Sequence, residues 1–457
     1  MGTTELSQAE LAELGCKGEF PGPRSRTVRQ KIEAIAWSGI DYSAIPFVLK
    51  AKRGSYLFDI DGNTYIDMVT GWGSSPLGIG DERLLEPTIA ALAQYGTEIS
   101  DYVASEPVLA LAEKLVEVSP ASLTRVEFDI SGTESVEMSM RLMRGKAERP
   151  FILSFFGQYH GESAGALGLG SQLAHEARYV RELTPGYIHV PYPEPYRCPF
   201  HRSERCDGLC VIDYIKEYIL GYYSTADRIA GVIIEPVAGE AGVWIPPDPF
   251  WPALVELCQE HEWLLCADEV QSGIGRTGKM FAVEHWNVQP DLMCLAKSLS
   301  AGTMPIGATL GTEEVMGSTE LYLGGTFAWT PAACVAALRG IDLIKSDNLL
   351  GHVGDLEQLL LERMGRWPAK YELVGDVRIK GLYIAVEFVA DKDSKRRIPD
   401  FARRVHARSV RGGVAGIYIP GMSLLRWLPA LNMSRETIEK AMDILEDSIV
   451  IESRQGL

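Results

Sequence analysis

A single lysine at the end of an apolar run is the most conspicuous side chain in this sequence that could do chemistry. Lys297 follows the run "DLMCLA" and is succeeded at once by the small residues of "SLSAG". Lysine is rarely buried without a partner, and removal from water lowers the pKa of an amine until its neutral, nucleophilic form is available. The other interpretation is a lysine whose long side chain carries its ammonium group to the surface. The position is therefore a candidate for an amine that attacks a carbonyl group.

Two carboxylates close a second apolar run. Asp268 and Glu269 follow "WLLCA", so at least one of them is expected at the end of a buried strand. A buried carboxylate is costly unless a charged partner accompanies it. That partner is either an arginine in a structural salt bridge or a heterocyclic nitrogen that the carboxylate keeps protonated.

A turn of small residues indicates a seat for an anion. In "RVEFDISGTESVEMSMRLMR", residues 131–133 lie between an alternating strand pattern and a helix in which Val136, Met140 and Met143 recur at helical spacing. The first amides of a helix and the positive end of its dipole favour phosphate binding. An ordinary N-cap with Glu134 in the first turn explains the same residues. Both interpretations predict a strand, a turn and a helix N-terminus at this point.

Short apolar runs that alternate with helical segments predict the scaffold for these groups. Between about residues 124 and 310, the strand candidates are "RVEFDI", "FILSFF", "YIHV", "GVIIEPV", "WLLCADEV", "DLMCLA" and "IGATLG". Strands that are apolar throughout and separated by helices indicate a mostly parallel sheet covered on both faces. Ligands of such α/β domains bind beyond the carboxyl ends of the strands, where the lysine, the acids and the turn are expected.

We expect the chain of 457 residues to divide into three parts. Residues 1–70 form an N-terminal segment that packs with the small domain and contains a hairpin-rich stretch at 45–68 with a "DGN" turn. Residues 71–345 form the large α/β domain. Residues 346–457 form a small α+β domain, which includes "LYIAVEFVA" and the helical "ETIEKAMDILEDSIV".

Composition and charge exclude several classes of function. The net charge of −17 at pH 7 argues against a nucleic-acid binder, whose footprint is basic. No run reaches the ~18 apolar residues of a membrane helix, and "MGTTELSQAE" lacks the features of a signal peptide. The eight cysteines, several of them inside apolar runs, are typical of reduced core residues. We therefore expect a cytoplasmic protein without a membrane or nucleic-acid partner.

One cluster of soft side chains stands apart from the other cysteines. Cys198, His201, Cys206 and Cys210 lie close together in "CPFHRSERCDGLC", and four such ligands could hold zinc. Their spacing matches no common zinc finger or ribbon. A surface loop without metal is the ordinary interpretation, and the sequence leaves both open.

The lysine, the carboxylate and the anion seat together meet the requirements of pyridoxal phosphate. This cofactor needs an amine for its carbonyl carbon, a helix N-terminus for its phosphate and a carboxylate for the protonated ring nitrogen that makes the ring an electron sink. The sequence places all three at strand ends of one sheet. It therefore predicts a pyridoxal-phosphate enzyme with no metal in its active site.

Six motifs in order resemble the class-III (ω-type) aminotransferases, a family of fold-type I pyridoxal-phosphate enzymes, over nearly the whole chain. They are "SGTE", "FFGQYHG", "EPVAGEAG", "ADEVQSGIGRTG", "LAKSLSAG" and "GGTFAWTP". The resemblance implies a mostly parallel sheet with helices on both faces plus a smaller α+β domain. It also implies a homodimer with active sites shared across the interface. The implied substrates are small: an amine or amino acid donor and a keto acid, aldehyde or ketone acceptor.

The residue roles of the family carry over onto matching positions. Lys297 corresponds to the Schiff-base and proton-transfer lysine, and Asp268 to the partner of the pyridine nitrogen. The other positions that the resemblance assigns to the cofactor are Ser131, Gly132 and Thr133 at the phosphate, Tyr159 stacked on the ring and followed by His160, Val270 under the ring, Gln271 at the ring hydroxyl, Glu235 beside the site, and Thr326 at the phosphate of the neighbouring subunit. The positions assigned to substrate are Trp72, Glu240 as a gate, Trp329, and Arg426, whose planar guanidinium suits a carboxylate.

Departures from the family pattern and shared chemistry leave alternatives open. "LGIGDE" lacks the usual histidine, and Ala328-Trp329 replaces a common pair of small residues, so the substrate is not fixed. The same sites serve racemases, epimerases and aminomutases, which begin with the same proton abstraction; Arg426 and Glu240 favour transamination. A nicotinamide dehydrogenase is a further alternative because residues 273–278 read G-x-G-x-x-G, although two acids precede these glycines.

Overall fold

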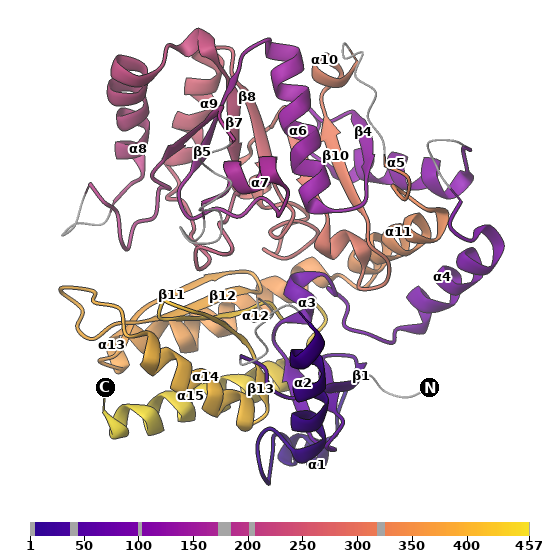
Figure 1. Ribbon diagram of the computed structural model, residues 1–457, viewed down its shortest axis with the longest axis vertical. Helices are drawn as coiled ribbons and strands as arrows, with labels where there is room; N and C mark the ends of the chain where they lie inside the picture. Colours follow the sequence, from indigo (N-terminus) through magenta and orange to yellow (C-terminus); the bar gives the residue numbers. More distant parts are fainter. Residues whose placement is uncertain are drawn as a thin grey trace. The chain divides into compact units, whose positions relative to one another are not determined.

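The computed structural model describes residues 5–36, 44–98, 103–171, 184–200, 206–317 and 325–456. The chain forms two compact units, whose elements are labelled in Figure 1. Residues 83–350 form the first, which we call the large unit. Residues 1–82 and 351–457 together form the small unit. The two ends of the chain thus share one unit, within which β3 (Thr64–Asp67) pairs in parallel with β13 (Val414–Ala415).

A seven-stranded sheet is the scaffold of the large unit. Its strand order is β4-β10-β9-β8-β7-β5-β6, and all neighbours run parallel except β10, which is antiparallel to both β4 and β9. The strands are β4 (Arg125–Asp129), β5 (Phe151–Phe155), β6 (Tyr187–Val190), β7 (Ile229–Ile234), β8 (Leu264–Asp268), β9 (Leu292–Leu295) and β10 (Gly307–Gly311). Each overlaps a strand predicted from the sequence, so the mostly parallel α/β sheet is confirmed.

Helices cover both faces of this sheet (Figure 1). The helix α6 (Gly132–Ala147) begins directly after β4, and the hydroxyl of its N-cap, Ser131, accepts a hydrogen bond from the amide of Glu134 at 3.2 Å. The predicted apolar positions Val136, Met140 and Met143 are buried in one core cluster with residues of β7, β8 and β9. The helix α6 leads from β4 to β5, toward the β6 edge of the sheet. The helix α9 (Phe250–Glu260) leads from β7 to β8, toward the β4 edge. Because such crossovers are right-handed, α6 and α9 lie on opposite faces.

The remaining helices of the large unit are shorter or lie at its edges. They are α5 (Glu106–Val118), α7 (Ala164–Leu169), α8 (Leu209–Tyr214), η2 (Ile215–Tyr223), η3 (Ala226–Arg228), η4 (Ala282–Trp286), η5 (Lys297–Ser300), α10 (Glu313–Met316) and α11 (Pro331–Ser346). Two helices cross the unit boundaries, α4 (Glu82–Tyr95) and α12 (Leu349–Arg363). Among the described residues, no helix has the length and apolar character needed to span a membrane.

The small unit contains two four-stranded sheets, of order β1-β2-β3-β13 and β11-β12-β15-β14. The predicted hairpin with its "DGN" turn is confirmed, because β2 and β3 pair antiparallel on either side of it. The strands not yet given are β1 (Leu49–Arg53), β2 (Tyr56–Asp59), β11 (Val374–Lys380), β12 (Tyr383–Phe388), β14 (Ile417–Ile419) and β15 (Leu424–Trp427). The helices are α1 (Gln8–Ala12), α2 (Pro23–Ile35), α3 (Thr70–Gly73), η6 (Met364–Arg366), α13 (Trp367–Lys370), α14 (Pro399–Arg411) and α15 (Arg435–Gln455).

Candidate active site

One edge of the large unit's sheet gathers the side chains that the sequence singled out. The strands β4, β5, β7, β8 and β9 run parallel, so their carboxyl ends meet at this edge. The residues that end or follow these strands are 131–133, Tyr159 and His160, Glu235, Asp268, and Lys297. The topology therefore places a helix N-terminus, two acids and a lysine side by side, where α/β sheets bind their ligands.

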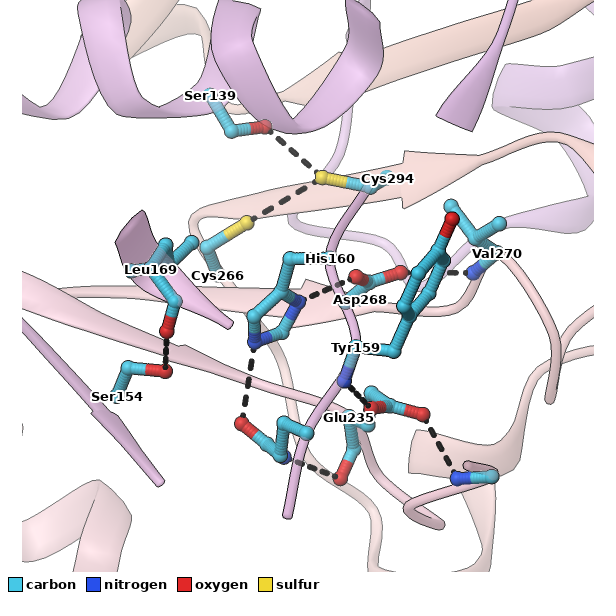
Figure 2. Close-up of polar contacts among 12 residues, drawn as sticks. Ser139, Ser154, Tyr159, His160, Leu169, Glu235, Cys266, Asp268, Val270 and Cys294 are labelled. Atoms are coloured by element: carbon cyan, nitrogen blue, oxygen red, sulfur yellow. Dashed lines mark hydrogen bonds and ion pairs between the residues drawn. The ribbon is translucent and has the colours of Figure 1, made fainter. Parts of the chain in front are cut away.

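A histidine and a backbone amide hold the carboxylate of Asp268. The ring nitrogen Nδ1 of His160 donates to Asp268 Oδ2 at 2.7 Å, and the amide of Val270 donates to Oδ1 at 3.1 Å (Figure 2). The other ring nitrogen of His160 lies 3.2 Å from Gln158 Oε1, which fixes the plane of the ring. All three side chains are buried. Among the described residues, no lysine or arginine lies within ion-pair distance of Asp268, so its charge is oriented without being neutralised by a permanent cation.

A second carboxylate, Glu235, is anchored by two backbone amides at the end of β7. The amide of Tyr159 donates to its Oε1 and the amide of Gly239 to its Oε2, each at 2.8 Å (Figure 2). Burial raises the pKa of Glu235 to about 7; the charge of Asp268 acts in the same direction, while His160 and the two amides oppose it. Glu235 thus ties the segment that carries Tyr159 to the strand beside β8.

The start of α6 lies close against two neighbouring segments because glycines stand there. A Cβ added at Gly132 would lie 2.7 Å from Val270 Cγ1, and one at Gly161 would collide with Thr133. The backbone of this helix end therefore approaches Val270 and the segment after β5 more closely than any side chain would allow. Because the first amides of a helix have no intrahelical acceptor, the N-terminus of this 16-residue helix can hold a phosphate group.

Lys297 occupies an unusual backbone conformation. Its φ angle is +39°, in the left-handed region, which costs a residue other than glycine on the order of 1–3 kcal/mol. The side chain is half-buried, and its Nζ lies 5.9 Å from the centre of the Tyr159 ring. The fold therefore maintains local strain at the lysine that the sequence singled out, beside an aromatic ring.

The other predicted residues of the large unit differ in exposure. Gln271 is buried in the turn after β8, and Thr326 is exposed. Glu240 is half-buried in the turn between the bridged residues Ala238 and Trp244. The roles of these side chains toward cofactor and substrate stay predictions.

Trp329 lies in the interior of the large unit. Its ring stacks on Phe128 of β4, with centroids 4.3 Å apart, and its indole N–H donates to the carbonyl of Gly307 at 2.6 Å. Only 1% of the residue is exposed. These contacts join β4, β10 and the segment before α11, and a role for Trp329 in substrate binding stays a prediction.

Arg426 and Trp72 both belong to the small unit. Arg426 lies in β15 and is completely buried, and its guanidinium carbon lies 5.4 Å from the centre of the Trp72 ring. Trp72 is itself 48% exposed and has a φ of +61°. The negative face of an aromatic ring attracts a guanidinium, so the indole helps to retain a cation in this interior. Their predicted roles toward substrate are proposals.

The sequence did not single out three residues that support this edge. Gln158 orients His160, and the only available signal was its position two residues earlier in "FFGQYHG". The hydroxyl of Tyr192 donates to the backbone carbonyl of Glu235 at 3.0 Å. Asp129 ends β4 with its Oδ2 accepting from the hydroxyl of Thr309 at 2.7 Å. No local pattern indicates the contacts of Tyr192 and Asp129, because their partners lie far along the chain.

Asp129 is also electrostatically unusual. It is fully buried, and its Oδ1 has no hydrogen-bond partner among the described residues. Burial raises the pKa of Asp129 to about 8; the bond from Thr309 opposes this shift, and the nearby Glu134 adds to it. Near neutral pH this carboxyl is therefore largely protonated.

The glycines at 273–278 do not open a helix. Residues 270–280 form turns after β8, in which Gly275 and Gly278 have φ angles of +90° and +84°. A dinucleotide site needs a helix N-terminus inside such glycines. The dehydrogenase alternative therefore lacks its structural requirement.

Comparisons with known proteins agree with this geometry. The family described as aminotransferase class-III matches residues 38–449. Similar proteins include an alanine/serine racemase from Pyrococcus horikoshii (33% identical, 94% of this chain and 91% of that protein), a leucine/methionine racemase from Thermococcus litoralis (34%, 90% and 93%) and a 4-aminobutyrate aminotransferase from Mycobacterium leprae (31%, 93% and 96%).

Solved structures of transaminases have the same fold as this chain over nearly its whole length. An (S)-enantioselective ω-transaminase from Thermomicrobium roseum superposes with a TM-score of 0.86 at 27% identity, over 94% of this chain and 99% of that one. An amine transaminase from an uncultivated Pseudomonas species, in its PLP-bound form, gives 0.85 at 29% identity, over 95% and 99%. These similarities confirm the expected fold-type I architecture.

Proposed function

This chain belongs to the class-III aminotransferase family, and from that premise we propose that it is an aminotransferase. Its cofactor is pyridoxal phosphate. The proposed reaction moves an amino group from an amine or amino acid donor to a keto acid, aldehyde or ketone acceptor. The observation that carries the proposal is Asp268, a buried carboxylate held by His160 and a backbone amide on the strand next to the one that Lys297 follows.

The residues at the sheet edge fit this cofactor, because the first amides of α6 have no intrahelical acceptor and suit a phosphate, and the buried carboxylate of Asp268 suits a protonated ring nitrogen. When bound, pyridoxal phosphate supplies a reactive carbonyl and a protonated ring nitrogen that accepts the electron pair left when a proton departs from the amino-bearing carbon. The residues that would hold it are Ser131, Gly132 and Thr133 at the phosphate and Tyr159, His160, Glu235, Asp268, Val270 and Gln271 around the ring.

Asp268 would keep the ring nitrogen protonated. Its carboxylate is only 3% exposed, and charges attract each other more strongly in such surroundings than in water. His160 and Val270 fix the direction in which the carboxylate points. The chain thus prepares a negative charge before the ligand arrives, so little reorganisation is needed during the reaction.

Lys297 would move the proton of the substrate carbon. Its Nζ, as a neutral amine, would accept the proton from the amino-bearing carbon and return it at another position. The Nζ lies 5.9 Å from the centre of the Tyr159 ring, and the small residues that follow the lysine would leave room beside it for the cofactor.

Arg426 and Glu240 would select the substrates. A buried guanidinium can bind the carboxylate of a keto acid in bidentate fashion, and Arg426 is completely buried. Glu240 would act as the gate that lets the enzyme accept an amine without a carboxylate as well. Trp72 and Trp329 are the aromatic residues that we assign to the substrate pocket.

The proposal extends to assembly and location. Thr326 is exposed, as expected of a residue that would complete the phosphate site of a second subunit in a homodimer. All eight cysteines are free, which suits a reducing compartment such as the cytoplasm.

A racemase or epimerase is the second candidate. Two relatives that bear racemase names, at 33% and 34% identity, favour it. Both reactions need Lys297 to remove the same proton. They differ afterwards, because a transaminase releases a keto acid and needs an acceptor, whereas a racemase returns the proton to the opposite face of the carbon.

An assay with and without acceptor distinguishes the two candidates. The holoenzyme is mixed with a panel of single-enantiomer amino acids and amines, in the presence or absence of pyruvate or 2-oxoglutarate, and products are separated by chiral chromatography. Transamination predicts a new amino acid only when the keto acid is present, while the remaining donor keeps its configuration. Accumulation of the opposite enantiomer without any keto acid would replace the proposal by the racemase.

A variant of Arg426 tests its role. Arg426→Ala should lower kcat/KM for the keto acid by roughly 30- to 1000-fold, because a charge-assisted bidentate pair is lost. A donor without a carboxylate should be affected less. Arg435→Ala is the matched control, because this arginine of the same unit makes only an exposed pair with Glu439. Equal losses for both classes of substrate would remove Arg426 from substrate recognition.

A further inference from the structure

We propose that Cys198, Cys206 and Cys210 form a zinc site, separate from the cofactor edge and not required by the proposed reaction. Cys198 and Cys206 lie between β6 and α8 of the large unit, and Cys210 is the second residue of α8. Cys198 follows β6 by eight residues. Cys198 and Cys206 are buried, and Cys210 is half-buried. His201, which the sequence analysis grouped with them, lies outside the described residues, and the proposal does not use it.

The distances between the sulfur atoms fit a shared metal ion. Sγ of Cys210 lies 3.2 Å from that of Cys206 and 3.7 Å from that of Cys198, and all three lie within 4.8 Å of one another. Zinc binds thiolates at about 2.3 Å in a tetrahedron, which sets the sulfur–sulfur edge at about 3.8 Å. A disulfide would need about 2.05 Å. Two edges of the triangle are therefore close to the edge of a zinc–thiolate tetrahedron, and the third is no longer than 4.8 Å.

The turn between Cys206 and Cys210 is built to present both sulfurs. The amide of Gly208 donates to Cys206 Sγ at 3.3 Å, a contact that stabilises a thiolate. Gly208 has a φ of +83°, and a Cβ there would lie only 3.1 Å from Phe250 Cβ and 3.2 Å from Pro193 Cβ. The carboxylate of Asp207 accepts from the amide of Leu209 at 3.0 Å and so starts α8. These contacts fix Cys206 and Cys210 in one short, closed turn.

The segment before Cys198 is equally well held. Glu194 is buried, and its carboxylate accepts hydrogen bonds from the amides of Tyr196, at 2.9 Å, and Arg197. Tyr192 lies six residues before Cys198 and donates its hydroxyl to the carbonyl of Glu235. A metal bound to Cys198 would therefore restrain the segment that supports the end of β7.

Zinc is the metal that this donor set favours. Soft thiolates in a tetrahedral arrangement select zinc or iron–sulfur clusters, and three sulfurs leave the fourth position of a single ion to water or another donor. Binding converts the three thiols to thiolates and releases three protons. The ion and the three neutral thiols together carry +2 before binding, and the complex carries −1. No oxidant or reductant is involved. The proposed reaction uses none of these three ligands, so the ion would contribute to the stability of the fold.

Metal content and thiol protection test the site in the untagged holoenzyme. The protein is stripped with a chelator, dialysed, and titrated with zinc chloride against a chromophoric competitor. We expect about one zinc ion per chain, protection of Cys198, Cys206 and Cys210 from alkylation as mapped by mass spectrometry, and a Tm that falls on chelation and returns with zinc. Cobalt substitution should give thiolate-to-metal charge-transfer bands.

Variants locate the ion. Cys206→Ser and Cys210→Ser should lose tight zinc binding, whereas Cys16→Ser, at a half-buried cysteine outside the cluster, should retain it. Equal pyridoxal-phosphate content in all three variants verifies folding. If the serine variants fail to fold, the reconstituted wild-type protein and its protection map decide alone. Zinc below about a tenth of an ion per chain after reconstitution, binding unchanged in both cluster variants, or a Cys206–Cys210 disulfide in the isolated protein would each overturn the site.

Discussion

Asp268 in the large unit is buried and Glu446 in the small unit is half-buried, and the partners of these two carboxylates differ in kind. Glu446 accepts hydrogen bonds from Arg363 at 2.6 Å, Lys370 at 2.8 Å and Tyr371 at 2.7 Å. Burial opposes its charge, but these bonds outweigh burial and lower the pKa of Glu446 to about 2. Asp268 is held by a histidine ring and a backbone amide instead. The small unit neutralises its carboxylate, whereas the large unit only orients one.

Other buried acids near the cofactor edge follow the pattern of the large unit. Glu269 accepts from the hydroxyl of Ser272 and, at 2.8 Å, from the amide of Val283, and burial raises its pKa to about 7. Neutral donors also hold Glu235 and Asp129. When a carboxylate is paired with arginine or lysine, its charge is balanced within the chain and needs no ligand. Carboxylates without a lysine or arginine partner leave an electrostatic demand, which at Asp268 a cationic ligand can meet.

The largest expected effect on turnover comes from replacing Lys297 of the large unit by alanine, with the same replacement of Lys370 in the small unit as the control. Lys297→Ala should lower turnover by roughly 10⁴-fold or more, because both a nucleophile and a proton carrier are lost. Lys370→Ala should leave kcat unchanged, because this lysine of the small unit contacts Glu446 and the Tyr371 ring and belongs to no part of the proposed site. Steady-state kinetics with an identified donor and acceptor compare the two. Wild-type turnover in Lys297→Ala would refute the assignment of the active site.

Asp268→Asn should have the next largest effect. Loss of the charge that holds the ring nitrogen protonated should lower kcat by about 10³-fold, while the start of α6 continues to bind the phosphate. Cofactor content after gel filtration and kcat are the two measurements. Asp443→Asn, which removes an ion-pair partner of Arg363 in the small unit, is the control and should retain kcat. Near-normal turnover in Asp268→Asn would make this aspartate purely structural.

Glu446→Gln should lower the stability of the fold and leave the rate of the reaction unchanged, unlike the two substitutions in the large unit. The substitution removes charge-assisted hydrogen bonds from a carboxylate that is 15% exposed, so the free energy of unfolding should fall by about 2 kcal/mol, with kcat unchanged. Urea unfolding at pH 7 measures it. Glu439→Gln, which removes only the exposed pair with Arg435, should change stability by less than about 0.5 kcal/mol. An equal loss in both variants would show that the hydrogen bonds of Arg363, Lys370 and Tyr371 to Glu446 have no special role in stability.

The smallest expected effect concerns pH. A carboxyl with a raised folded-state pKa stabilises the fold while it is protonated and loses that contribution as pH rises through this pKa. For Asp129 the contribution is complete below about pH 4 and declines through about pH 8. Asp129→Asn stays neutral, so its stability relative to the wild-type apoprotein should increase by about 1 kcal/mol between pH 7 and pH 9.

Urea unfolding of the apoprotein at the two pH values measures this difference. Glu446→Gln is the control, because a carboxyl with a pKa of about 2 does not change its charge in that range. A difference for Asp129→Asn that is the same at pH 7 and pH 9 would show that the carboxyl titrates elsewhere.

The sequence predicted those features of the fold that local patterns determine. Apolar runs and helical spacing depend on neighbouring residues, so every strand of the large sheet and the start of α6 could be predicted. Strand order and the antiparallel direction of β10 depend on residues far apart in the chain. No pattern in "IGATLG" distinguishes a parallel strand from an antiparallel one.

The same division holds for the candidate site. Asp268 and Lys297 could be singled out because charged residues at the ends of apolar runs are costly and therefore informative. The contact from Gln158 through His160 to Asp268 joins the segment after β5 to the end of β8 and needed the structure. The positive φ of Lys297 was equally hidden, because only glycine signals such a conformation in a sequence.

The position of β10 sets the order in which the strands of the large sheet can pair while the chain is being synthesised. Within the sheet, β4 reaches the other strands only through β10, and the bond from Thr309 to Asp129 spans 180 residues of chain. Contacts between such distant residues form late. On the ribosome, β5 to β9 would be able to pair before β10 has emerged, with Asp268 and Lys297 already in place. β4, the strand before α6, would join the sheet only after residue 311 has emerged, so the earliest strand of the large sheet would be the last to gain its partner there.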